Sequence, residues 1–106
     1  MSLDIWLTAM SETPVYEANI THNLAGMADA AGIYVTLWNA DKQTTTAFDL
    51  IQPLQWAIDD MEKRPDFYKH FDAENGWGTY DDFVPWLEEL LEACKMYPNA
   101  KVEISK

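Results

Sequence analysis

The chain has 106 residues, with 18 acidic side chains against 7 basic ones and a formal net charge of −11. That length fits one domain over residues 1–106, and a composition that is 48% hydrophobic and 13% aromatic excludes a disordered acidic tail. An acidic surface repels phosphate backbones and anionic lipids, so we expect neither direct nucleic-acid binding nor membrane binding. The N-terminal residues lack the pattern of a signal peptide, and we expect a cytoplasmic protein.

Three short segments near the two ends of the chain are predicted to be strands. Residues 3–8 alternate in part, with their leucines and isoleucine on one face. Turn formers at residues 11–14 separate this segment from a second one at 15–20, and the pair predicts a hairpin. Residues 101–106 alternate strictly and are flanked by lysines, which predicts a third strand at the edge of the sheet.

Helical periodicity fills the region between these strands. A short helix is predicted over residues 23–32, ending at a glycine, while the pattern leaves the type of segment 34–38 open. A longer apolar periodicity covers residues 47–61 and contains Pro53. Because proline removes one backbone donor and disfavours helix at the preceding residue, we expect either a single turn followed by a helix that starts at Pro53 or a kinked helix, ending before Pro65.

The second half of the chain predicts a loop followed by another helix. Residues 66–71 are expected to form a short helical turn, and 72–78 a loop in which two glycines bracket Trp77. We expect this tryptophan to fill the core, as large aromatic side chains often do. Thr79 with an acid three residues later resembles a capping box, which begins a helix that Pro98 closes.

These elements predict a single α+β domain. A small antiparallel sheet, made of the N-terminal hairpin and the C-terminal strand, packs against about three helices. The segment around His22 and the glycine-rich loop both precede helices, and we expect them to converge at one end of the domain. Four tryptophans stand at core spacing, and any left on the surface would mark an interface; the four are Trp6, Trp38, Trp56 and Trp86.

A candidate ligand site lies at the predicted strand-to-helix junction, where ligands often meet the free N–H groups of a helix start. In one interpretation His22 is a general base or a ligand anchor. In the other, Thr21 or Asn23 caps the helix and His22 bonds a nearby backbone carbonyl. Both interpretations stay open from the sequence. The candidate ligand-binding residues are Asn19, Thr21, His22, Asn23 and Tyr80.

The sequence contains no recognisable catalytic, metal or cofactor motif. No serine or cysteine stands in a nucleophile motif, and Cys94 falls on an apolar helix face where cysteine behaves as a small buried hydrophobe. His22, His70, Asp72 and Glu74 are suitable metal ligands by type but not by spacing. We therefore predict no catalytic residue, no metal and no cofactor, and a binding protein is favoured over an enzyme.

Acidic side chains concentrate in the second half of the chain. They form either a solvated, solubilising face or a negative surface that docks on the basic surface of a protein partner. The residues of this candidate interaction surface are Asp59, Asp60, Asp81, Glu88, Glu89 and Glu92.

Two motifs carry a resemblance to other proteins: Asn-Ile-Thr-His-Asn-Leu at residues 19–24 and Asn-Gly-Trp-Gly-Thr-Tyr at 75–80. With them the chain resembles a family of small uncharacterised proteins of bacteriophage and bacterial genomes. The resemblance implies a phage accessory role and brings no catalytic residue to carry over. We expect an acidic protein-interaction module, an accessory or inhibitor protein that binds a basic partner; the alternative is a small ligand-binding or hydrolytic domain using the His22 junction.

Overall fold

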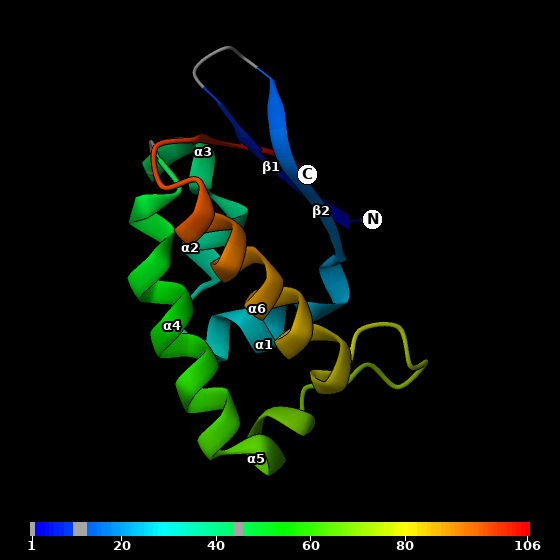
Figure 1. Cartoon of the computed structure of the whole chain (residues 1–106). Coiled ribbons are helices and arrows are strands. Elements are labelled where there is room, and N and C mark those ends of the chain that lie inside the picture. Colours follow the sequence, from blue (N-terminus) through cyan, green and yellow to red (C-terminus); the bar gives the residue numbers. More distant parts are fainter. Residues whose placement is uncertain (1, 10–12, 44–45) are drawn as a thin grey trace.

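A computed structural model describes residues 2–9, 13–43 and 46–106, and it confirms the predicted α+β fold (Figure 1). The turn expected at residues 11–14 lies partly outside this range. The elements in chain order are β1 (Ser2–Thr8), β2 (Pro14–Thr21), the 3₁₀ turn η1 (His22–Leu24), α1 (Ala25–Ala30), α2 (Tyr34–Trp38), α3 (Ala40–Gln43), α4 (Phe48–Lys63), α5 (Pro65–Lys69), α6 (Tyr80–Met96) and β3 (Lys101–Ser105).

The three strands form one antiparallel sheet in the order β2-β1-β3. Ile5 of β1 lies opposite Ala18 of β2 on one side and Ile104 of β3 on the other. With Leu3 and Leu7, Ile5 is buried in the core, whereas the residues between them point to the opposite face of the sheet. The prediction that the C-terminal strand lies at a sheet edge is confirmed.

The core lies between the sheet and the helices, and α4 and α6 supply most of its helical side. The two helices run side by side (Figure 1). Each presents leucines at helical spacing to the other side chains of the core, among them Leu54 and Leu87, both completely buried. This arrangement leaves one long face of each helix open to solvent.

Helix α4 runs through Pro53 without interruption, so the alternative of a helix starting at Pro53 is wrong. Its first turn is fixed from outside the helix, because the Phe48 N–H donates to the Pro98 carbonyl at 2.9 Å. Proline costs this helix one backbone hydrogen bond, and buried Leu50 and Leu54 hold the turns on either side of it. Tertiary packing therefore overrides the local preference.

Three helix ends follow the capping chemistry of the sequence: the starts of η1 and α6 and the end of α1. Thr21 caps η1, since its Oγ1 accepts from the Asn23 N–H at 3.2 Å. Gly32 ends α1 at a φ of 80°. Thr79 caps α6 as predicted, since its Oγ1 accepts from the Asp82 N–H at 3.3 Å and donates to Asp82 Oδ2 at 3.0 Å.

Two tryptophans predicted to be core residues lie on the surface. Trp77 is 74% exposed and Trp56 is 65% exposed, so both predictions are wrong. Trp56 is on the side of α4 away from its buried row, and Trp77 stands between Gly76 and Gly78, whose positive φ values turn the loop outward from the core. Trp38 is buried as predicted, and Trp86 is half-buried against the core. Trp6 is half-buried on the outer face of the sheet, outside the core, so that prediction is wrong too, because strand alternation turns it away from inward-facing Ile5 and Leu7.

Candidate functional site

The strand-to-helix junction and the glycine-rich loop meet, as predicted. Asn23 Nδ2 donates to the Trp77 carbonyl at 2.8 Å. Gly78 lies so close to the junction that an added Cβ would stand 3.0 Å from Thr21 Cγ2 and 3.1 Å from Asn23 Cβ. Glycine is therefore required at position 78 for steric reasons, in addition to its φ of 113°.

The candidate ligand residues do not all meet at this junction. Asn19 points from the outer face of the sheet, where its Nδ2 donates to Asp4 Oδ1 at 2.5 Å and to Ser2 Oγ at 2.9 Å. The Tyr80 hydroxyl donates to the Met61 carbonyl at 2.9 Å and so faces α4. The structure groups Thr21, His22 and Asn23, and it uses the side chains of Asn19, Asn23 and Tyr80 in intramolecular hydrogen bonds.

His22 belongs to a small aromatic cluster. Its ring stands edge-on to Trp38 at 6.1 Å between centroids, and Trp38 stacks on Tyr34 at 5.4 Å. Within the described residues, His22 Nε2 and Trp38 Nε1 are both buried without a hydrogen-bond partner. The expected bond from His22 to a backbone carbonyl is thus not made by Nε2, and the ring contacts hold the imidazole in place.

The solvent-facing side of α6 is strongly acidic. Its acids fall within one arc of the helix, all of them are exposed, and Lys95 is the single basic residue in the helix sequence. Lys95 Nζ lies 3.9 Å from Glu92, the only ion pair that the described residues form on this helix. We call this surface the acidic face of α6; it consists of Asp81, Asp82, Glu88, Glu89 and Glu92.

Asp59 and Asp60, the two remaining predicted interaction residues, lie on α4. Asp59 accepts from Gln55 Nε2 at 3.0 Å. Asp60 pairs with Arg64 at 2.6 Å and also accepts from the Tyr68 hydroxyl. The hydrogen bond from Arg64 and then the one from Tyr68 lower the pKa of Asp60. Asp60 therefore holds the end of α4 to α5 and is a poorer candidate for contact with a partner.

The acidic charges of α4 and α6 approach each other around Tyr80. Burial raises the pKa of the Tyr80 hydroxyl, and the carboxylates of Glu62, Asp81 and Glu88 raise it further. Lys69 lies over the Tyr80 ring, 5.5 Å from its centroid, and balances part of this charge. The acidic face of α6 therefore extends at this end to Glu62 of α4.

The outward side of α4 carries exposed aromatic rings instead of charge. Phe48 is 67% exposed, and it lines, with Ile51, Pro53 and Trp56, a shallow groove of about 570 Å³. Sequence reasoning missed this surface because it assigned Trp56 to the core. The signal was present, since neither ring shares the helical face of the buried Leu50 and Leu54.

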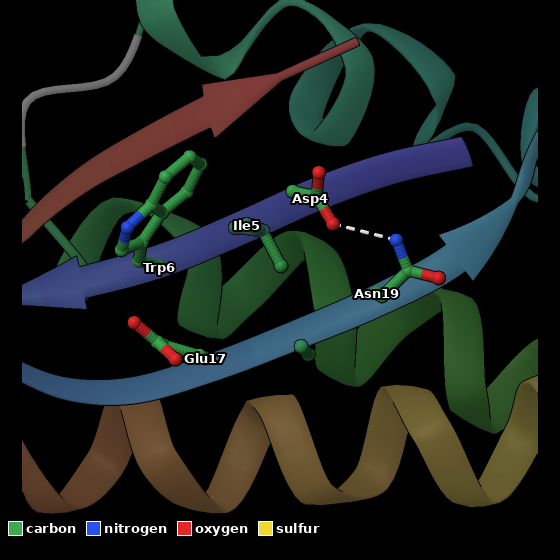
Figure 2. Close-up of a pocket in the computed structure, with 6 residues that line it drawn as sticks. Asp4, Ile5, Trp6, Glu17 and Asn19 are labelled. Atoms are coloured by element: carbon green, nitrogen blue, oxygen red, sulfur yellow. Dashed lines mark hydrogen bonds between the residues drawn. The ribbon is translucent and has the colours of Figure 1, made fainter. Parts of the chain in front are cut away.

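A second hollow, of about 390 Å³, lies on the outer face of the sheet (Figure 2). Asp4 and Trp6 of β1 line one side, and Glu17 and Asn19 of β2 line the other. The sequence singled out Asn19 as a candidate ligand residue and Trp6 as a core residue, and it did not place either of them in a shared site. These residues become neighbours through the strand register, in which Asp4 faces Asn19 and Trp6 faces Glu17. We call this feature the sheet hollow.

Helix α6 runs beside β2, next to the sheet hollow (Figure 2). Trp86 Nε1 donates to the Asn19 carbonyl at 3.0 Å, which joins the helix to the edge of the sheet. The carboxylate of Glu89 adds to the effect of burial in raising the pKa of Tyr16 on β2. The acidic face of α6 and the sheet hollow therefore border the same strand.

Metal and thiol chemistry find no support in the part of the chain that the structure describes. No group of three or more histidine, cysteine, aspartate or glutamate side chains there could hold a metal ion. Cys94 is buried, and burial raises the pKa of its thiol to about 12. A thiol with that pKa is almost fully protonated at neutral pH, so Cys94 is a packing residue, as predicted.

Comparison of the chain with protein-family models, curated proteins and solved structures gives no significant match. Among the described residues, no helix has the length and apolar character needed to cross a membrane. The surfaces of the protein are therefore the guide to its function.

Proposed function

We propose that the protein is a non-enzymatic acidic interaction module that binds the basic surface of a protein partner. The observation that carries this proposal is the acidic face of α6, where five exposed carboxylates share one side of a helix with a single lysine. Charge of one sign on one surface steers an oppositely charged partner and selects against partners of the same charge. A phage accessory or inhibitor role in the cytoplasm is consistent with this proposal.

The position of these acids also supports the proposal. Asp81, Glu88 and Glu89 form no ion pair in the described part of the chain, and Lys95 lies 3.9 Å from Glu92. Carboxylates that are not neutralised within the chain keep their charge available to a partner. Because the helix is anchored by buried leucines on its other side, the acids are held on a rigid element.

Affinity capture from a bacterial lysate tests the proposal. The wild-type protein is compared with the triple variant E88K/E89K/E92K, at low and at high salt. Each reversal changes the charge by two, so the variant has a net charge of −11 + 6 = −5. We expect the wild type to retain a basic protein at low salt and to lose it at high salt, and we expect the variant to retain none.

A matched control variant distinguishes the effect of charge on the acidic face of α6 from the effect of net charge. The variant D29K/D66K/E74K has the same net charge, and its three positions are exposed and lie outside α6. We expect this control to capture the partner as the wild type does at low salt. Equal loss of the partner by both variants, or capture that does not depend on salt, contradicts the proposal.

A further inference from the structure

We infer that the sheet hollow is a docking site for an arginine side chain of the protein partner. The inference rests on the proposed function and names the contact that adds specificity to it. The indole ring of Trp6 and the carboxylates of Asp4 and Glu17 line the hollow, which has a volume of about 390 Å³. A cation is the group that this combination binds best, since both the ring face and the carboxylates attract positive charge.

Trp6 is the aromatic member of the site. It projects from β1, the central strand, between two acids of the neighbouring strands: the register places Glu17 opposite it on β2 and Glu103 opposite it on β3. Its side chain is half-buried and lines the hollow. Trp6 thus offers a fixed ring surface at low entropic cost, as tryptophan does at many interface hot spots.

The carboxylates differ in how far the chain itself uses them. Glu103 accepts from Thr8 Oγ1 at 2.7 Å and lies 3.9 Å from Lys101 Nζ. Asp4 receives the Asn19 amide on Oδ1, which orients its carboxylate and leaves Oδ2 for another donor. Glu17 is exposed and has no ion pair or hydrogen bond to its side chain within the described residues. Among the described residues, no cation pairs with the carboxylates of Asp4 and Glu17, so their free acceptor oxygens are available to an external donor.

Arginine matches these groups better than lysine does. Its guanidinium is planar, stacks on an indole face and donates in several directions of one plane, so it can contact Trp6 and reach a carboxylate at once. A lysine ammonium is more strongly hydrated and does not stack. The acidic face of α6 lies beside β2 and adds attraction for a basic surface that carries such an arginine.

Two-dimensional ¹⁵N NMR of the labelled protein tests the inference with a defined probe. The probe is N-acetyl-arginine amide, which imitates a side chain within a protein, and the neutral isostere N-acetyl-citrulline amide is the control ligand. We expect saturable shifts of the Trp6 indole N–H and of β1 and β2 amides with the arginine probe and none with citrulline. Free arginine is titrated as well, and much tighter binding of the free amino acid would overturn docking of a protein side chain.

Variants locate the binding within the hollow. We expect E17Q and W6L each to weaken binding of the arginine probe by about fivefold, and W6F by less, because phenylalanine keeps a ring with a weaker electrostatic face. E17Q keeps the size and exposure of the side chain, so it tests the site even if W6L fails to fold. The matched control E74Q removes one charge from an exposed loop and is expected to bind as the wild type does.

The outcomes separate this inference from the proposed function. Equal weakening by E17Q and E74Q, shifts spread over all acidic segments, or equal binding of citrulline would overturn the sheet hollow as an arginine site. If one of these results is found and E88K/E89K/E92K still loses the partner, the arginine site is contradicted and the proposed function is supported.

Discussion

Helices α4 and α6 are close in length, at 16 and 17 residues, and each contains a proline and packs one apolar face into the same core. Their outward faces differ. That of α4 exposes Phe48 and Trp56, whereas that of α6 exposes five carboxylates. The core is formed by the inner faces, so the residues of the outer faces can differ between the two helices without a change of fold.

The difference between the two helices shows where function can be sought. An apolar residue on an inner face contributes by excluding water, and its replacement affects the whole domain. A residue on an outer face contributes little to folding. The exposed aromatic rings on α4 and the exposed acids on α6 therefore need an explanation other than stability, and contact with other molecules supplies one.

The largest expected loss of stability comes from substitutions on the inner faces of α4 and α6. Leu54→Ala in α4 and Leu87→Ala in α6 each remove a completely buried side chain, and we expect each to cost about 2–5 kcal/mol of the free energy of unfolding. Urea denaturation measures the change. Trp56→Ala, on the outer face of α4, is the control and should stay within about 0.5 kcal/mol of the wild type. A loss at Trp56 as large as at Leu54 would remove the distinction between faces.

An intermediate effect is expected at the start of α6. The start of α6 follows Gly78, where an added Cβ meets Thr21 and Asn23 within 3.1 Å at a φ of 113°. Gly78→Ala should cost about 2–3 kcal/mol, from backbone strain together with overpacking. Gly32→Ala is the matched control, since its φ is 80° and nothing lies within 4 Å, and about 1 kcal/mol is expected there. Equal losses in thermal or urea unfolding would show that the close contact with the junction is unimportant.

The smallest effect concerns the end of α4. Arg64 and Tyr68 lower the pKa of Asp60 in the folded state, so its contribution to stability is present above the ordinary aspartate pKa of about 4 and is lost as the pH falls through the lowered value. Asp60→Asn should therefore be less stable than the wild type at neutral pH, and the difference should shrink below about pH 4. Urea denaturation across this pH range measures it.

Asp59→Asn serves as the control for that experiment, because Asp59 accepts a hydrogen bond from Gln55 and forms no ion pair among the described residues. Because Asp59 lacks the Arg64 pair and the Tyr68 hydrogen bond, we expect Asp59→Asn to change stability less at neutral pH than Asp60→Asn does. A pH dependence at Asp59 equal to that at Asp60 would contradict the role given to the Arg64 pair.

The sequence predicted the fold where local chemistry and periodicity agree. The alternation in residues 3–8 predicts a strand, Thr79 predicts a helix start, and the leucine spacing that follows predicts a buried helix face. The structure confirms all three. The path of α4 through Pro53 was left open because the outcome depends on packing on both sides of the proline. Local propensity has no information about those contacts.

The candidate sites were harder to predict because they depend on neighbours that are distant in the chain. Trp6 and Glu17 come together only through the register of β1 with β2. The hydrophobic pattern of each strand predicts which residues face the core, but it does not predict which outward-facing residues of the two strands lie opposite each other. Trp77 was assigned to the core on residue type alone, although its position depends on the turn at Gly76 and Gly78. The acids of α6 were predicted as a group because a helix places them by spacing.

The position of β1 in the middle of the sheet has a consequence for how the protein is made. Thr8 bonds Glu103 across 95 positions, so a strand near the start of the chain acquires its second partner only after β3 has been synthesised. Until then β1 has one unpaired edge, and closing the long intervening segment to form the β1–β3 pair has an entropic cost. We therefore expect the sheet to be completed late in folding, and we expect a chain shortened before Lys101 to leave the central strand as an edge open to other molecules.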